Sequence, residues 1–188
     1  MKITLLDGNP DKADFQFVNY MGRLHRQLST GHHLTAFELR DLKVDSCIGC
    51  WDCWWKTPGR CVLKDDVEEM MRSAINSDFL LIAAPLVAGF IPYKAKMALE
   101  RFIPLIHPYI TLLEGECHHR KRYEQYPDMG IILKNESSTD KEDLQINRQI
   151  FERLTLNFHS HLRIFETIDV KSPETIVHEI DHIQRLTA

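Results

Sequence analysis

The sequence predicts an α/β protein of three layers, in which helices cover both faces of a doubly wound sheet of five parallel strands. Short apolar segments alternate with amphipathic helical patterns in the order β-α-β-α-β-α-β-α-β-α. Such alternation is typical of a parallel sheet with right-handed crossovers. In addition, residues 79–84 are apolar at every position, as expected for a strand buried on both faces.

Length and composition narrow the class of protein. The 188 residues correspond to one domain spanning 1–188, and 44% apolar with 27% charged residues is ordinary for a globular chain. The formal charge of −4 disfavours nucleic acid or an anionic membrane as partner. The apolar run after Lys2 ends at Asp7, and the longest apolar stretch is shorter than the roughly 20 residues of a membrane span. We therefore expect a cytoplasmic protein with reduced thiols.

The first strand and helix come directly from the N-terminal pattern. Residues 2–6 form a β-rich run that ends in the turn sequence Asp7-Gly8-Asn9-Pro10. Residues 17–28 then place apolar side chains at helical spacing, and Gly31 ends the helix. Residues 33–39 alternate and predict the second strand.

The middle of the chain supplies the next strand and its two flanking helices. Asp65-Asp66 begins a helix whose acidic first turn suits the helix dipole. Residues 79–84 form the third strand, which Pro85 ends. Pro92 is expected in the first turn of a helix that runs to about Phe102.

Two strands and two helices complete the pattern. Residues 129–133 and 162–165 are the fourth and fifth strands, and apolar residues between 150 and 158 indicate the helix that joins them. Ser172-Pro173 is a start signal for the last helix. Five strands and five helices match the flavodoxin-like strand order 2-1-3-4-5, in which ligands bind beyond the carboxyl ends of the strands.

Two loops at that end are candidate binding segments. The loop after the first strand brings a glycine-containing turn to a helix N-terminus, where backbone N–H groups can hold a phosphate. It lacks the G-x-G-x-x-G pattern of a dinucleotide site, and an ordinary βα turn is the alternative. The loop after the third strand is apolar and could pack on a flat aromatic ring, or merely cover the sheet end. The residues concerned are Gly8, Asn9, Pro10, Asp11, Lys12 and Ala13, and Pro85, Leu86, Val87, Ala88, Gly89 and Phe90.

The third candidate segment, residues 41–64, contains four of the five cysteines. Cys47, Cys50, Cys53 and Cys61 have the spacing C-x2-C-x2-C-x7-C. Three thiolates around one turn with a distal fourth can hold a cubane iron–sulfur cluster, whereas zinc usually takes two separated C-x2-C pairs. All three tryptophans lie in this segment and could shield a redox centre. The sequence leaves an iron–sulfur cluster, zinc, and reduced thiols that only pack as alternatives.

A fourth segment, residues 103–126, is expected to be a long loop because it has no hydrophobic period. Its cationic part, Glu116 to Tyr123, could receive an anionic substrate or the phosphate of a nicotinamide cofactor. Glu116, Cys117 and His118 could also bind a metal ion. The alternatives are a solvated charged loop or a contact between subunits.

Together these segments resemble the flavodoxin-like NAD(P)H-dependent FMN reductases, including the iron–sulfur flavoproteins. The matching features are Asp7-Gly8-Asn9-Pro10, the run from Cys47 to Cys61 with its Lys56-Thr57-Pro58-Gly59, Asp65-Asp66, Pro85 through Phe90, Glu100-Arg101 and Glu116 to Tyr123. The resemblance covers about residues 1 to 135, and the cysteine run is its most specific part.

The resemblance implies an oxidoreductase in which FMN, and no side chain, carries the chemistry. FMN would place its phosphate over Gly8 to Ala13 and its ring against Pro85 to Phe90, with NAD(P)H as hydride donor. The four cysteines would hold a 4Fe-4S cluster, and electrons would pass to a small-molecule or protein acceptor. Relatives also lead us to expect a homodimer or homotetramer, with 103–126 as a possible subunit contact. A non-catalytic electron carrier or metal-binding module with the same fold is the alternative.

Two departures from the family pattern matter for this expectation. Asp11 and Asp14 bring negative charge near the expected phosphate, so we expect Lys12 to compensate. Leu86 stands where an aromatic residue is often found after Pro85.

Overall fold

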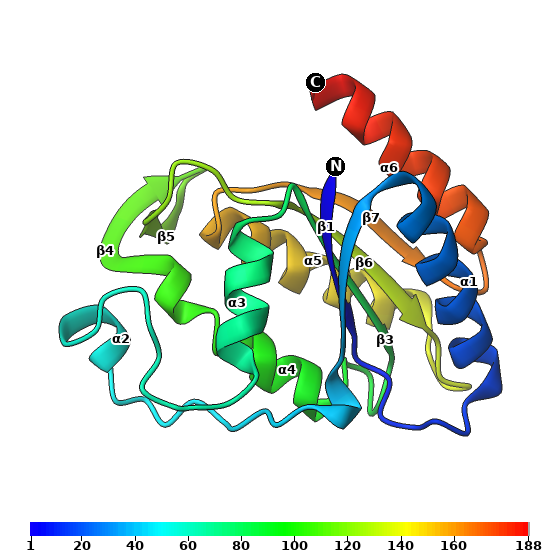
Figure 1. The fold of residues 1–188 in the computed structure, drawn as a ribbon, viewed down its shortest axis with the longest axis horizontal. Helices are drawn as coiled ribbons and strands as arrows, with labels where there is room; N and C mark the ends of the chain where they lie inside the picture. The colour runs from blue at the N-terminus through cyan, green and yellow to red at the C-terminus, as the bar shows by residue number, and fades with distance from the viewer. Residues whose placement is uncertain (188) are drawn as a thin grey trace.

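A parallel sheet of five strands forms the centre of the computed structural model, which describes residues 1–187 (Figure 1). Its order is β2-β1-β3-β6-β7, and every neighbouring pair is parallel. The strands are β1 (Lys2–Asp7), β2 (His33–Glu38), β3 (Phe79–Pro85), β6 (Asp128–Lys134) and β7 (Leu162–Thr167). This confirms the predicted flavodoxin-like order of five strands. Six of the seven residues of β3 are buried, as its continuous apolar sequence predicts.

Helices cover both faces of the sheet, so the architecture has three layers. The helices are α1 (Phe15–Gly31) and α6 (Pro173–Thr187) on one face, and α3 (Val67–Ile75), α4 (Tyr93–Glu100) and α5 (Lys141–Asn157) on the other. Successive side chains of a strand point to opposite faces, so β1 contributes Leu5 to the α1–α6 core and Leu6 to the second core. The central strands are therefore buried on both faces, whereas the edge strand β2 is largely exposed.

Helix starts follow the capping signals in the sequence. Pro173 is the first residue of α6, and the Thr175 N–H donates to Ser172 Oγ, which confirms the predicted start. α5 begins at Lys141, before its apolar pattern, because Asp140 and Asp143 form a capping box. Helix α4 begins at Tyr93, directly after Pro92, and ends at Glu100.

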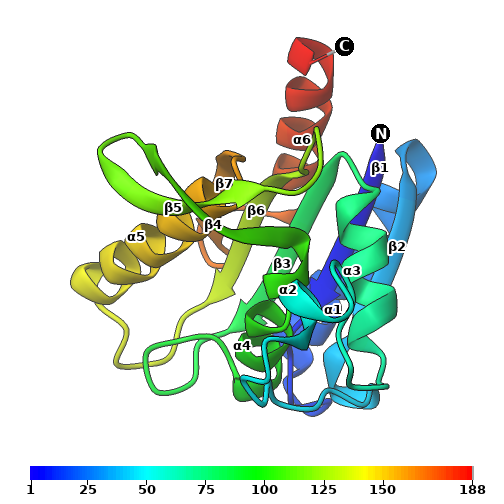
Figure 2. The same cartoon turned by 90° about the vertical axis from the view of Figure 1, so that its left-hand side faces the viewer.

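The segment expected to be a long loop instead contains a β-hairpin, and this corrects the prediction. After the turn η2 (Ile103–Leu105), strands β4 (Ile106–Leu113) and β5 (Glu116–Lys121) pair antiparallel. Glu114 and Gly115 connect them with φ of 52° and 82°, as a type I′ turn requires. Most of the hairpin is half-buried or exposed on both faces, so its sequence shows no apolar alternation. Figure 2 shows the hairpin standing apart from the main sheet.

The cysteine segment runs from the carboxyl end of β2 along the lower edge of the molecule in Figure 1. It follows the turn η1 (Leu39–Asp41) and contains the four-residue helix α2 (Asp52–Trp55), which has no hydrophobic period long enough to predict. Within residues 1–187, no helix combines the length and the apolar character that crossing a membrane requires.

Candidate functional site

The loop after β1 lies tightly against β3 and α4 at the carboxyl end of the sheet. The Gly8 N–H donates to the Ala83 carbonyl oxygen at 2.7 Å. A Cβ atom on Gly8 would lie 3.0 Å from the Cβ of Ala84 and 3.1 Å from the Cβ of Ala95. Only glycine allows this close approach, so the structure brings the two predicted binding loops, which follow β1 and β3, side by side.

The N-terminus of α1, which the sequence nominates for a phosphate, holds carboxylates of the chain itself. Asp11 Oδ1 accepts from the Ala13 N–H at 2.8 Å, and Asp14 Oδ1 accepts from the Phe17 N–H at 3.2 Å. The Lys134 ammonium lies 2.6 Å from both oxygens of Asp14. Asp14 is the N-cap residue of α1, so a carboxylate of the chain already occupies a donor at this helix N-terminus.

Positive charge also gathers beside this loop. Arg40 lies 3.5 Å from an oxygen of Asp7 and from the Asn9 carbonyl oxygen, and Lys12 pairs with Asp41 at 2.8 Å. Burial raises the pKa of Asp7 above its ordinary value, although the Asn9 N–H and the Arg40 guanidinium act against this. Because Lys12 pairs with Asp41, its charge neutralises an acid of the chain in this structure.

The loop after β3 presents two consecutive backbone N–H groups to one anion. Val87 and Phe90 exchange N–H···O bonds of 2.7 and 3.3 Å, and between them Ala88 and Gly89 have φ of 52° and 79°. This geometry is a type I′ turn, and it aims successive amides in one direction. The Glu136 carboxylate accepts from both amides, at 3.0 Å from Ala88 and 2.9 Å from Gly89.

Two buried side-chain oxygens at the same end of the sheet lack a hydrogen-bond partner among the residues described. They are Asn135 Oδ1, just after β6, and Thr167 Oγ1, the last residue of β7. Buried polar atoms without partners are uncommon and can mark a binding site. The carboxyl end of the sheet therefore contains two backbone donors, which Glu136 occupies, and buried oxygens without a partner.

The four clustered cysteines converge on one side of the molecule. Burial, together with the neighbouring thiols of Cys61, Cys50 and Cys47, raises the pKa of Cys53 to about 11. Residues 49, 51 and 59 have φ of 64°, 64° and 83°, so the backbone of the segment turns at three left-handed positions. Among residues 1–187, no three Cys, His, Asp or Glu side chains form a group able to hold a single metal ion.

An ion pair fixes the end of the cysteine segment. Arg101 donates to both oxygens of Asp65 at 2.7 and 2.9 Å, and to the Asp45 carbonyl oxygen at 2.8 Å. Burial alone would lower the pKa of Arg101, but hydrogen bonds with Asp65 and the nearby Cys61 and Asp65 charges raise it. Asp65 and Arg101, which belong to two separate sequence features named above, thus form one ion pair.

The middle of the cysteine segment, at Trp54, contacts the residues around the hairpin. The Trp54 indole N–H lies 3.2 Å from the Ile103 carbonyl oxygen and 3.1 Å from that of Ile106, and its ring lies 5.1 Å from the His119 ring. His118, in β5, is buried, with Nδ1 3.4 Å from Asn157 Oδ1 and Nε2 3.5 Å from a Glu116 oxygen. These contacts give the cationic segment a structural role that its sequence did not predict.

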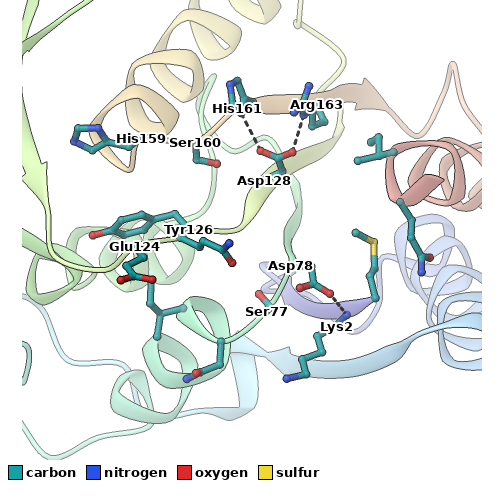
Figure 3. Close-up of a pocket in the computed structure, with 16 residues that line it drawn as sticks. Lys2, Ser77, Asp78, Glu124, Tyr126, Asp128, His159, Ser160, His161 and Arg163 are labelled. Atoms are coloured by element: carbon teal, nitrogen blue, oxygen red, sulfur yellow. Dashed lines mark hydrogen bonds and ion pairs between the residues drawn. The ribbon is translucent and has the colours of Figure 1, made fainter. Parts of the chain in front are cut away.

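A cavity of about 870 Å³ lies at the opposite, amino end of the sheet (Figure 3). On one side Asp128 accepts from Arg163 at 2.7 Å and lies 3.1 Å from His161 Nδ1; on the other the Lys2 N–H donates to Asp78 at 2.6 Å. Arg163 pairs with the Asp128 carboxylate, whereas Asp78 accepts only from a backbone N–H, so the lining of the cavity is polar. None of the predicted site residues lines it.

Several residues at the carboxyl end were missed by the sequence analysis. Lys134, Asn135 and Glu136 follow the fourth predicted strand directly, so the rule that ligands bind beyond strand ends could have nominated them. Arg40 follows the second strand in the same way. No local signal indicates that Glu136 meets residues 48 positions away.

Comparison with known proteins supports the predicted resemblance. No protein-family model matches the chain. Over 105 residues it is 27% identical to an iron–sulfur flavoprotein of Methanocaldococcus jannaschii, covering 56% of this chain and 53% of that protein. An iron–sulfur flavoprotein of Archaeoglobus fulgidus is 28% identical over 107 residues, covering 57% and 48% respectively. The matches thus span about half the length of these curated relatives.

Solved structures confirm the flavodoxin-like fold. An FMN-dependent NADH-azoreductase of Bacillus anthracis has a TM-score of 0.55 and 14% identity, covering 95% of this chain and 93% of its own. An NAD(P)H:quinone oxidoreductase of Methanothermobacter marburgensis has a TM-score of 0.57 and 16% identity, covering 87% and 85%.

Proposed function

We propose that the protein is an FMN-dependent oxidoreductase that accepts hydride from NAD(P)H and passes electrons to an acceptor, with a 4Fe-4S cluster held by the cysteine segment. The observation that carries the proposal is the pair of amides at Ala88 and Gly89, which already hold two carboxylate oxygens at the carboxyl end of the sheet. The similarity to iron–sulfur flavoproteins and to flavin-dependent reductases supports it.

The residues at this end fit FMN by their chemistry. The N–H groups at the start of α1 and in the 87–90 turn hold anionic oxygens, which stand in for the phosphate and for the acceptor atoms of the flavin ring. Lys12 and Lys134 are close enough to this loop to offer positive charge once their carboxylate partners move away. When bound, FMN supplies the hydride and electron chemistry.

The protein's own part in such a reaction is positioning. The loop from Gly8 to Ala13 would hold the phosphate, and Pro85 to Phe90 would lie against the ring. The amides of Ala88 and Gly89 would donate to ring acceptor atoms and favour negative charge there. Leu86 is buried in the core, whereas Val87 is 49% exposed, so Val87 is the side chain of this loop that would offer apolar surface to the ring.

The spacing of the cysteine segment supports the choice of a cluster over a single ion. A zinc ion at about 2.3 Å from each sulfur needs its ligands tightly grouped. In a cubane each iron takes one thiolate, so the sulfurs stand farther apart around the cluster. The thiols of Cys61, Cys50 and Cys47 act together on the pKa of Cys53, and these four cysteines would hold the cluster, which would supply one-electron transfer.

The test begins with anaerobically purified protein. We expect bound iron and sulfide in about equal amounts, quenching of FMN fluorescence on titration, and FMN-dependent oxidation of NADH or NADPH. Cys53→Ser should lose iron, whereas Cys117→Ser, at an exposed cysteine outside the segment, should retain it. Protein that leaves FMN fluorescence unchanged at saturating concentration would refute the flavin assignment. Iron-free protein in which all five thiols are titratable, the four of the segment and Cys117, would refute the cluster.

A non-catalytic electron carrier or metal-binding module is the second candidate. It is favoured by one observation, namely that carboxylates of the chain occupy the anion-binding amides at both predicted loops. NADPH oxidation under air with added FMN would exclude this alternative. The reducing cytoplasm remains the expected location for either function.

A further inference from the structure

The Glu136 carboxylate accepts from the N–H groups of Ala88 and Gly89, which the proposed function assigns to the flavin ring. Other contacts hold these two N–H groups in place. The 87–90 turn is closed by its own hydrogen bonds, and the Leu86 N–H donates to the Lys134 carbonyl oxygen at 2.8 Å. The Asn147 side chain, 1% exposed, donates to the Gly89 carbonyl oxygen at 2.9 Å. The amides of Ala88 and Gly89 therefore stay in place when the carboxylate leaves.

The backbone of Glu136 is held separately from its carboxylate. Its N–H donates to Thr139 Oγ1 at 2.9 Å, and the Thr139 N–H donates back to the Glu136 carbonyl oxygen at 3.2 Å. The side chain makes no other hydrogen bond or ion pair within residues 1–187 than those to the two amides. Rotation about its own side-chain bonds is enough to free both donors.

Ala88 holds this turn in a conformation that is uncommon for a residue with a Cβ atom, as Glu114 does in the hairpin turn. A positive φ is uncommon for a residue with a Cβ atom, and such strain concentrates at ligand-binding positions. The strain is maintained at a point where two amides converge on an acceptor.

We propose that Glu136 is an internal ligand that competes with the flavin ring for the amides of Ala88 and Gly89, and so sets the affinity for FMN. The inference rests on the proposed function. A ligand whose site is open only part of the time binds with its intrinsic dissociation constant divided by the open fraction. Removing the carboxylate opens the site permanently, so affinity should rise.

The experiment compares Glu136→Ala and Glu136→Gln with the wild type, and uses Glu142→Gln as matched control. Glu142 is exposed and lies in the first turn of α5, outside the hydrogen bonds that hold the 87–90 turn. The readouts are the dissociation constant of FMN from fluorescence quenching, the amide NMR shifts of residues 88 and 89, and the melting temperature without FMN.

We expect Glu136→Ala to bind FMN about tenfold more tightly or better, which corresponds to at least about 1.4 kcal/mol. Glu136→Gln should lie in between, because its neutral amide offers one acceptor oxygen. Glu142→Gln should match the wild type. Without FMN, Glu136→Ala should melt at a lower temperature and shift both amide signals.

The sign of the change separates competition from a purely structural role. If Glu136 only stabilises the loop, Glu136→Ala will bind FMN as weakly as the wild type or more weakly, and the inference is overturned while the proposed function stands. If neither the wild type nor any variant binds FMN, the proposed function and the inference both fail. Binding by Glu136→Ala alone would support the inference in its strongest form.

Discussion

Arg101 and Asp65 form an ion pair that is almost completely withdrawn from solvent, with side chains 1% and 0% exposed. Burial alone would raise the pKa of Asp65, but hydrogen bonds from Arg101 and from the Asp45 N–H lower it below its ordinary value. A pair of this kind adds little net stability over an apolar pair, yet losing one partner leaves a buried charge. Its visible role is to fix the cysteine segment against α3 and α4.

Arg101→Met should therefore lower the free energy of unfolding by about 3–5 kcal/mol, because Asp65 is left charged and unpaired. Urea denaturation followed by circular dichroism measures the change. Arg72→Met, at a side chain 71% exposed on α3, is the control and should stay within about 0.5 kcal/mol of wild type. If Arg101→Met lowered the free energy of unfolding no more than Arg72→Met does, the ion pair would not be needed for stability.

The pKa of Asp7 shifts upward, in the opposite direction to that of Asp65. Because burial raises its pKa, the folded protein holds a proton on Asp7 more readily than the unfolded chain does, so ionised Asp7 opposes folding. This penalty is absent below the ordinary pKa of 3.8 and is complete once the pH exceeds the raised value.

Asp7→Asn should thus stabilise the protein near neutral pH, on the order of 1 kcal/mol, while keeping an acceptor for the Asn9 N–H. The advantage should shrink as the pH falls toward 3.8. Unfolding free energies measured across this range check both statements. An advantage that grows on acidification would contradict the assigned direction.

At the scale of elements, β6 contains a glycine that its neighbours require. A Cβ atom on Gly130 would lie 2.8 Å from Cε1 of Phe79 and 2.9 Å from Cδ1 of Leu81. Both neighbours are fully buried in β3, where they cannot move aside freely. The irregular register between β6 and β7 falls at the same position.

Gly130→Ala should accordingly destabilise the protein by about 1–3 kcal/mol through overpacking. Gly22→Ala is the matched comparison, because Gly22 lies within α1 and a Cβ atom added to it would meet no atom within 4 Å. That change should raise stability by about 0.5–1 kcal/mol through helix propensity. Thermal denaturation of both variants would refute the packing argument if the two changes had the same sign.

At the scale of the whole molecule, the hairpin carries apolar side chains into solvent. Tyr109, Ile110 and Leu112 are 57%, 53% and 74% exposed, and the hairpin pairs with no further strand within residues 1–187. An apolar surface next to unpaired strand edges is typical of a contact between chains. This agrees with the proposal that residues 103–126 join subunits.

Analytical ultracentrifugation should therefore give a mass that is a multiple of the chain mass. Leu112→Glu should shift the distribution toward the monomer at least tenfold in dissociation constant, since it buries a charge in the contact. Val170→Glu, equally exposed at a distant position, should leave the mass unchanged. A monomeric wild type at micromolar concentration would dismiss the expected homodimer or homotetramer.

The sequence by itself determined the five strands, their order, the principal helices and the positions of the candidate loops. The elements depend on hydrophobic period, capping residues and turn residues, which are encoded in neighbouring positions, whereas the strand order was predicted from the match to a known doubly wound topology. The cysteine spacing likewise showed that four thiols could converge. The hairpin was missed because strands exposed on both faces carry no apolar alternation.

Only the tertiary structure decided which groups fill the candidate site. Glu136 meets Ala88 across 48 positions, and Arg101 meets Asp65 across 36. Such contacts depend on how the strands and loops are placed in space, and no local pattern specifies them. β3 and β6 are neighbours in the sheet, so their carboxyl ends lie side by side. This proximity is why the Glu136 carboxylate, after β6, can accept from the amides of Ala88 and Gly89, after β3.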